Sequence, residues 1–170
     1  NKGGCFHSQK YPRTRIVHRA ARPCPWQDIN TAFPDARIRI TPMSRSRINS
    51  GSKFEELAGY SRAVIDGNWI FVSGTSGHYP KTGEIEEGVE AQTRQSLKVI
   101  EEALTEANSC LEDIVRVRVF ASEREYVWPI SEILKEKMDH FRPTNTTLIT
   151  GFADPAMKME IEVTALRQTD

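Results

Sequence analysis

The chain has 170 residues, of which 38% are hydrophobic and 27% charged, and its formal net charge is zero. This length suits one globular domain with a real core, and no apolar run approaches the roughly 20 residues that a membrane-spanning helix needs. The cysteines Cys5, Cys24 and Cys110 form neither a metal spacing nor an even disulfide set, so we expect a reducing compartment, the cytoplasm.

Residues 1–42 differ in kind from the rest of the chain. Eight basic and two acidic residues give them a charge of +6, and five prolines interrupt any regular element, whereas the remaining 15 basic and 21 acidic residues give −6. We expect 1–42 to be an extension from an upstream start, outside a domain that covers 43–170. The alternative is a functional basic arm that binds an acidic partner.

Two apolar-rich runs, 61–66 and 69–73, open the domain. Asp66 and Gly67 lie between them, and this dipeptide favours the positive φ values of a type I′ turn, so the runs are predicted to pair as an antiparallel hairpin. A loop with four glycines and a proline follows over 74–88.

A helix is predicted next, because apolar residues recur at spacings of three and four from Thr93 to Ala107, with Asn108 as a left-handed residue at its end. Residues 113–121 then alternate as a strand does. Their pattern places one set of side chains on the core face (Val115, Val117, Val119) and another set opposite (Arg116, Arg118, Phe120).

The second helix is predicted to begin near Trp128 and to be ended by Pro143. Strands at 146–149 and 157–166 complete the domain. The last strand alternates strictly, with one face apolar (Met157, Met159, Ile161, Val163, Ala165) and the other polar (Lys158, Glu160, Glu162, Thr164). The polar face is either a solvated surface or the wall of a ligand cleft between subunits.

This order of elements predicts an α+β fold, because two helices cannot cover both faces of such a sheet. We therefore expect a mostly antiparallel sheet with two helices on one face. The other face must be solvated or covered by a partner subunit. Aromatic and charged side chains mixed on that face favour contacts between subunits.

Six segments in one collinear series over about 54–166 carry a resemblance to a known family. They are Tyr60–Val64, Trp69–Thr75, Thr82–Glu84, Gln92–Leu97, Leu111–Val119 and Asp154–Ala165. Together they resemble the reactive intermediate deaminase (Rid, YjgF-like) family. The resemblance implies a chorismate-mutase-like fold, a homotrimer and clefts between neighbouring subunits. Members with the deaminase activity hydrolyse enamines and imines, such as 2-aminoacrylate, to ketoacids and ammonia, with no metal and no organic cofactor.

The resemblance also implies the site residues. Ligand would lie against Tyr60, the pair Ser73 and Gly74, and the carboxylate of Glu160. The family's substrate-binding arginine corresponds to Asn145, and its frequent cysteine to Thr147, so the chain resembles an arginine-lacking branch. Asparagine brings no charge, and the loss of a bidentate arginine–carboxylate contact is not conservative.

Some alternatives stay open at these positions. Arg62 and Arg118 are candidates for the missing positive charge, with ion pairs between subunits as the simpler interpretation. Tyr60 suits a ligand contact or a buried hairpin position. Ser73 has no activating partner that the sequence reveals, and His78 is interpreted as a solvated residue or cap.

The first function hypothesis is a trimeric hydrolase in which Glu160 acts on water, since imine hydrolysis needs only modest acid–base help. The alternative is a non-catalytic trimer that binds a small molecule or regulates. Nuclease activity and a nucleic-acid partner are not expected, because the domain is acidic. A chorismate mutase is weaker still, since fold alone does not define function. No metal, cofactor or membrane is expected.

Overall fold

The computed structural model describes residues 45–168. The predicted extension 1–42 lies outside the described residues. In chain order the elements are β1 (Ser46–Ile48), α2 (Lys53–Ala58), β2 (Ala63–Asp66), β3 (Trp69–Thr75), α3 (Val89–Glu106), β4 (Ile114–Ala121), α4 (Val127–Met138), β5 (Thr144–Ile149) and β6 (Met159–Leu166), with short 3₁₀ turns at Leu111–Asp113 and Arg124–Tyr126.

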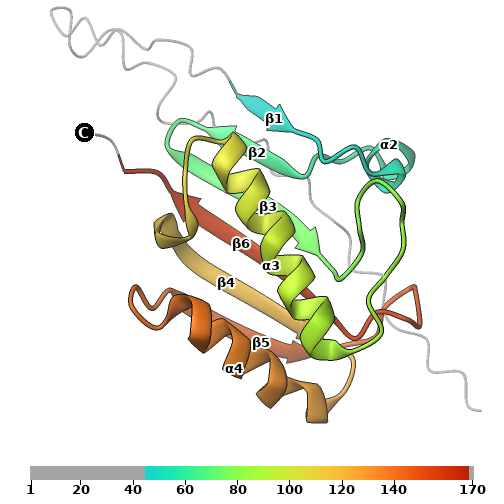
Figure 1. The fold of residues 1–170 in the computed structure, drawn as a ribbon. Helices are drawn as coiled ribbons and strands as arrows, with labels where there is room; N and C mark the ends of the chain where they lie inside the picture. The colour runs from blue at the N-terminus through green and yellow to red at the C-terminus, as the bar shows by residue number, and fades with distance from the viewer. Residues whose placement is uncertain (1–44, 169–170) are drawn as a thin grey trace, which may run out of the picture. The chain divides into compact units, whose positions relative to one another are not determined.

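The strands form one sheet in the order β1-β2-β3-β6-β4-β5, shown in Figure 1. All neighbours are antiparallel except β4 and β5, which run parallel. The last strand of the chain therefore lies in the middle of the sheet, between β3 and β4. This confirms the predicted α+β class with a mostly antiparallel sheet.

The hairpin of β2 and β3 is confirmed, but its turn type is not. Asp66 pairs with Trp69, and of the two residues between them only Gly67 has a positive φ, of 63°. One positive φ at the first central position fits a type II′ turn, whereas the expected type I′ turn needs two.

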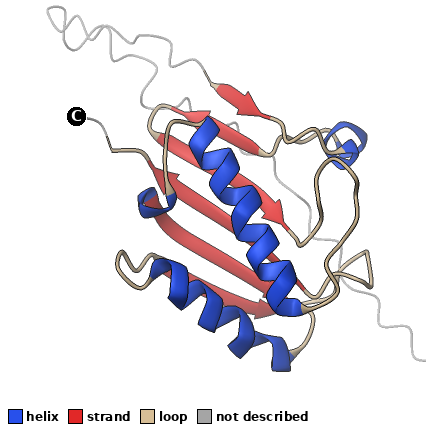
Figure 2. Ribbon diagram, in the orientation of Figure 1, coloured by secondary structure: helices blue, strands red, loops and turns tan. Residues whose placement is uncertain are grey.

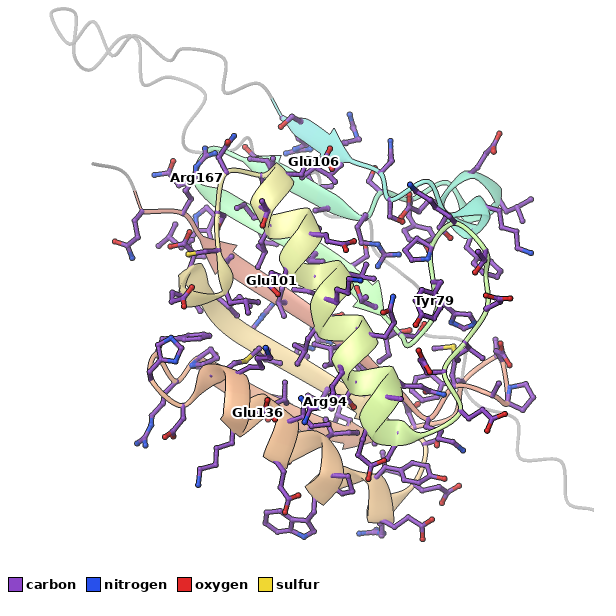
Figure 3. All side chains as sticks on the ribbon, in the orientation of Figure 1. Tyr79, Arg94, Glu101, Glu106, Glu136 and Arg167 are labelled. Carbon is purple, nitrogen blue, oxygen red and sulfur yellow. The ribbon has the colours of Figure 1, made fainter. Side chains whose placement is uncertain are left out.

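Helices α3 and α4 lie against the same face of the sheet, as Figure 2 shows. Their buried stripes (Leu97, Ile100 and Leu104 of α3; Ile130, Ile133 and Leu134 of α4) pack on Val117, Val119, Ile161 and Val163 of the central strands. Arg94 of α3 reaches Glu136 of α4 in an exposed ion pair of 2.8 Å (Figure 3). The expectation of two helices on one face is confirmed.

The end of α3 follows the predicted chemistry. Asn108 has φ 55°, and the amides of Asn108 and Ser109 donate to the carbonyls of Thr105 and Leu104 at 3.0 and 2.9 Å. These two bonds define a Schellman motif. The helix begins at Val89, directly after the predicted loop 74–88.

Three local predictions were wrong. A bulge between Ile114 and Arg116 rotates Val115 out of the core, so its side chain is exposed. Met157 lies before β6 and is only half-buried. The elements β1 and α2 were missed, because three and six residues are too short for a periodic pattern.

The face of the sheet away from the helices carries exposed aromatic side chains. Trp69 and Phe71 of β3 are 44% and 45% exposed, and their rings stack with centroids 6.5 Å apart. Phe71 pairs with Thr164, and Glu160 and Glu162 pair with Phe120 and Arg118 of β4, so these residues share that face. Hereafter we call it the open face.

Candidate functional site

A cavity of about 400 Å³ lies where β3 leads into the loop before α3. This volume is within the range of small-molecule sites. Four of the predicted site residues line it together: Tyr60, Arg62, Gly74 and Glu160. Its walls are largely apolar and come from distant parts of the chain, including Phe54, Pro80 and Met157.

Glu160 lies in the cavity because Gly74 has no side chain. A Cβ atom placed on Gly74 would lie 2.1 Å from Glu160 Oε1, far inside the contact limit. Gly74 has no positive φ, so space rather than backbone conformation requires the glycine. The Glu160 carboxylate thus packs directly against the β3 backbone at Gly74.

The environment of Glu160 changes its acidity. Burial raises the pKa of its carboxyl, the positive charge of Arg62 opposes this, and the charge of Glu162 adds to it. Within residues 45–168 the carboxylate has neither a hydrogen-bond nor an ion-pair partner. A half-buried acid that faces a cavity without a partner is typical of a functional group rather than of a structural one.

Arg62 connects the cavity to the fold. Its side chain is buried, with its Nη1 donating to the Gly74 carbonyl at 2.9 Å and to Thr75 Oγ1 at 2.8 Å. Its Nε pairs with Glu55 Oε1 at 3.3 Å, within the same chain. Glu55 is buried as well, and it accepts hydrogen bonds from the amide and hydroxyl of Ser50. Arg62 therefore fixes the end of β3 beside Glu160.

Tyr60 and Ser73 differ in how they face the cavity. Tyr60 is partly exposed, lines the cavity, and has the Arg62 guanidinium 5.9 Å from its ring centroid. The Ser73 hydroxyl donates to the carbonyl of Ser61 at 2.7 Å and does not line the cavity. Ser73 thus joins β3 to the segment that leads into β2.

The other predicted residues lie away from this cavity. Asn145 and Thr147 of the edge strand β5 pair with Val117 and Val119, so they share the helix side of the sheet. Glu160 is on the opposite face. Arg118 forms an ion pair of 3.0 Å with Glu162 on the open face. Within one chain, none of these three residues reaches the Glu160 cavity.

His78 was interpreted as a solvated residue or cap, yet it lines the cavity. Its Nδ1 lies 2.7 Å from Ser76 Oγ and its Nε2 lies 3.4 Å from Asp154 Oδ2. Sequence spacing could not reveal this group, because Asp154 lies 76 positions after His78 in the chain. The presence of a histidine in a glycine-rich loop was the only signal.

Gln92 joins the two loops that carry these residues. Its side chain is fully buried, and its Nε2 donates to the carbonyls of Glu86 at 2.7 Å and Ala156 at 2.9 Å. The amide of Lys158 donates to its Oε1 at 2.8 Å. One side chain at the start of α3 therefore holds both the 76–88 loop and the segment that leads into β6.

Among residues 45–168, no group of three or more acidic, histidine or cysteine side chains is arranged to hold a metal ion. The helices of this described part are all too short or too polar to cross a membrane.

A cavity with apolar walls around one carboxylate that has no partner within residues 45–168 has the size and lining typical of a small-molecule site. Residues 50–167 match the family described as Endoribonuclease L-PSP, and the chain belongs to this family, which includes the YjgF-like proteins. The resemblance that the sequence motifs indicated is therefore confirmed.

Three relatives illustrate the match. Protein mmf2 of Schizosaccharomyces pombe, described as mitochondrial, is 33% identical over 127 residues, covering 72% of this chain and 98% of mmf2. The crystal structure of Rv2704 from Mycobacterium tuberculosis, a member of the YjgF/YER057c/UK114 family, has a TM-score of 0.67 at 33% identity and covers 72% of this chain and 99% of its own.

The third relative is named for a chemical activity. TdcF of Escherichia coli, named a putative reactive intermediate deaminase, is 30% identical over 111 residues, covering 64% of this chain and 86% of TdcF. Its crystal structure with bound serine has a TM-score of 0.60 at 29% identity and covers 64% of this chain and 88% of its own.

Proposed function

We propose that the cavity hydrolyses a small enamine or imine, releasing ammonia and a carbonyl compound. The observation that carries the proposal is the Glu160 carboxylate, which is half-buried and faces the cavity. Within residues 45–168 it has neither a hydrogen-bond nor an ion-pair partner. Burial raises the pKa of this carboxyl, which makes its ionised form a better proton acceptor. Glu160 takes a proton from the water that attacks the C=N carbon.

The neighbours of Glu160 suit this reaction. Tyr60 and Phe54 provide aromatic surface for an apolar substrate, and the Gly74 backbone leaves room beside the carboxylate. Arg62 contributes positive charge at the wall, although its Nε and Nη1 are already bound to protein groups. The relation to TdcF, named a putative reactive intermediate deaminase, supports the same reaction class.

The working unit in this proposal is a homotrimer. The exposed Trp69 and Phe71 on the open face support self-association, since monomers rarely leave such a patch uncovered. Asn145 and Thr147 then contact the ligand of a neighbouring copy, because their strand register excludes them from the cavity of their own chain. Ser73 and Arg118 contribute to the same cleft between subunits.

The remaining expectations concern setting and partners. We propose a cytoplasmic protein that uses no metal and no organic cofactor. Its partners are a small molecule and other copies of itself. Nucleic acid is not a partner of the domain, because its acidic residues outnumber its basic ones.

Hydrolysis of freshly generated 2-aminoacrylate tests the function. We compare the wild type with Glu160→Ala, Asn145→Arg and the matched control Glu162→Ala, which removes a carboxylate two residues along the same face. Acceleration by the wild type and the control, but not by Glu160→Ala, supports the proposal.

Two other outcomes contradict parts of it. Activity only in Asn145→Arg means that the cleft is intact but built for a ligand without a carboxylate beside the C=N group. No activity in any variant, with ligand binding retained, favours the non-catalytic binding protein.

A further inference from the structure

A linked set of three polar side chains lines the cavity beside Glu160. Ser76 and His78 come from the loop after β3, and Asp154 comes from the segment before β6. The imidazole lies between the other two, with Nδ1 2.7 Å from Ser76 Oγ and Nε2 3.4 Å from Asp154 Oδ2.

The imidazole is held in this position. His78 has a side chain only 17% exposed, and Phe54 packs edge-on against its ring with centroids 6.1 Å apart. The other oxygen of Asp154 accepts a hydrogen bond of 2.8 Å from the amide of Ala156, which leaves Oδ2 for the imidazole. The charged groups that line the same cavity are Arg62, Asp154 and Glu160.

Hydrolysis of a C=N bond moves protons in two directions. Water loses both of its protons as its oxygen becomes the carbonyl oxygen, and an imine nitrogen gains two before ammonia departs. A carboxylate that takes a proton from water can pass it on only if it also reaches the nitrogen, so a proton donor on another wall of the cavity lets the two transfers occur together.

We propose that Asp154, His78 and Ser76 form a proton relay that delivers a proton to the substrate nitrogen while Glu160 receives one from water. This inference rests on the proposed hydrolysis. Protonated His78 donates from Nδ1 to Ser76 Oγ as the Ser76 hydroxyl donates its own proton to the nitrogen. Asp154 stabilises the imidazolium through Nε2, and His78 is reprotonated from solvent.

The balance of the reaction closes without any further reagent. Glu160 takes one proton from the attacking water as the relay gives one to the nitrogen, which yields the carbinolamine. The relay then protonates the amino group, Glu160 takes the hydroxyl proton, and the C–N bond breaks with its electron pair on nitrogen as the C=O bond forms and ammonia leaves. In each step Glu160 returns its proton to solvent and the relay takes one from solvent, so no net charge accumulates on the protein.

Chemical rescue tests the relay. In His78→Ala we expect the hydrolysis rate to fall about 10- to 100-fold, within or just below the usual range for general acid–base groups. Added imidazole is expected to restore much of that loss, because the vacated space lies open to the cavity. A purely structural role for His78 would not respond to imidazole. The matched control is His140→Ala, an exposed histidine paired with Glu112 outside the cavity.

Two more variants keep the test decisive. Ser76→Ala is expected to lose less than His78→Ala, since a water molecule can replace the hydroxyl, and imidazole should not restore it. If His78→Ala does not fold, His78→Gln retains a polar side chain that cannot transfer a proton, and it should show the same loss of rate.

The outcomes separate this inference from the function on which it rests. If the wild type hydrolyses the substrate and Glu160→Ala does not, while His78→Ala and His78→Gln match the wild type, the relay is wrong and the hydrolase stands. If His78→Ala is slow but imidazole does not restore it, the relay is also wrong. A wild type without activity overturns both.

Discussion

The carboxylate of Glu160 lies directly over Gly74, at a place where a Cβ atom on the glycine would be 2.6 Å from the carboxyl carbon. This pairing joins the end of β3 to the start of β6. A side chain added at Gly74 would clash with the flexible end of the Glu160 side chain rather than with backbone. Such a mutation can therefore affect function without a large effect on stability.

Replacing this glycine should therefore impair function more than folding. In Gly74→Ala the new methyl group displaces the Glu160 carboxylate, and we expect at least about a tenfold loss of hydrolysis, with destabilisation near the usual 1 kcal/mol of a point mutation. Kinetics and urea unfolding measure the two effects. The matched control is Gly151→Ala, where a Cβ would meet nothing within 4 Å. Equal activity in both variants would show that Glu160 does not need this position.

Glu160 itself should lower stability at neutral pH. Burial raises the pKa of the Glu160 carboxyl in the folded state above its value in the unfolded chain. The protonated carboxyl therefore favours the folded state below the unfolded pKa, and this contribution is lost as pH rises through the folded pKa. We expect Glu160→Gln to raise Tm by roughly a few degrees at neutral pH, and not in acid, where both states are protonated.

Thermal unfolding followed across pH checks this sign. Glu162→Gln is the control, because Glu162 already has Arg118 as a partner and should gain nothing when neutralised. A Glu160→Gln variant that is less stable than the wild type at neutral pH would mean that the carboxylate has an attractive partner in solution.

Arg62 should be the costliest arginine to remove. Arg62→Met leaves buried Glu55 without its cationic partner, and breaking a buried pair in this way costs about 3–5 kcal/mol. Arg94→Met breaks only the exposed pair with Glu136 and should cost about 0–1 kcal/mol. Chemical denaturation of both variants gives the comparison. If the two variants lose a similar free energy of unfolding, the Glu55 carboxylate is in contact with water and the prediction is wrong.

Gln92 should determine the stability of the two loops that carry the cavity. Gln92→Leu leaves the carbonyls of Glu86 and Ala156 and the amide of Lys158 without their partner, which we expect to cost roughly 2–4 kcal/mol. Hydrogen exchange should rise first at Lys158. Gln95→Leu, on the same helix but partly exposed, is the control. Unchanged exchange at Lys158 would contradict this role.

The repeating elements of this fold could be predicted from sequence, because period and turn chemistry are local. The apolar stripe of α3 placed its buried residues correctly, and the alternation of β6 did so for Met159, Ile161, Val163 and Ala165, although Thr164 on its polar side is buried as well. The errors fall where a neighbouring strand decides the outcome. Val115 follows the apolar alternation of β4, but a bulge opposite β6 turns it outward. Such a bulge depends on pairing between segments about 50 positions apart.

In the candidate site, too, residues that belong to local motifs were predicted, whereas contacts between distant segments were missed. Glu160 and Gly74, which line the cavity, were predicted because each stands in a segment that carries the family resemblance. The His78 contacts were missed because Asp154 comes from a distant segment. The Arg62 contacts were missed because the sequence does not show that Glu55 lies in a short helix beside it. Asn145 and Thr147 lie on the helix side of the edge strand β5, away from the cavity of their own chain.

In β6, residues that pack against the helices alternate with residues that face away from them. Met159, Ile161, Val163 and Ala165 are buried in the core, while Glu160 belongs to the cavity and Glu162 to an ion pair with β4. A substitution at Met159, Ile161, Val163 or Ala165 therefore tests folding, whereas a substitution at Glu160 or Glu162 tests the surface that the residue faces.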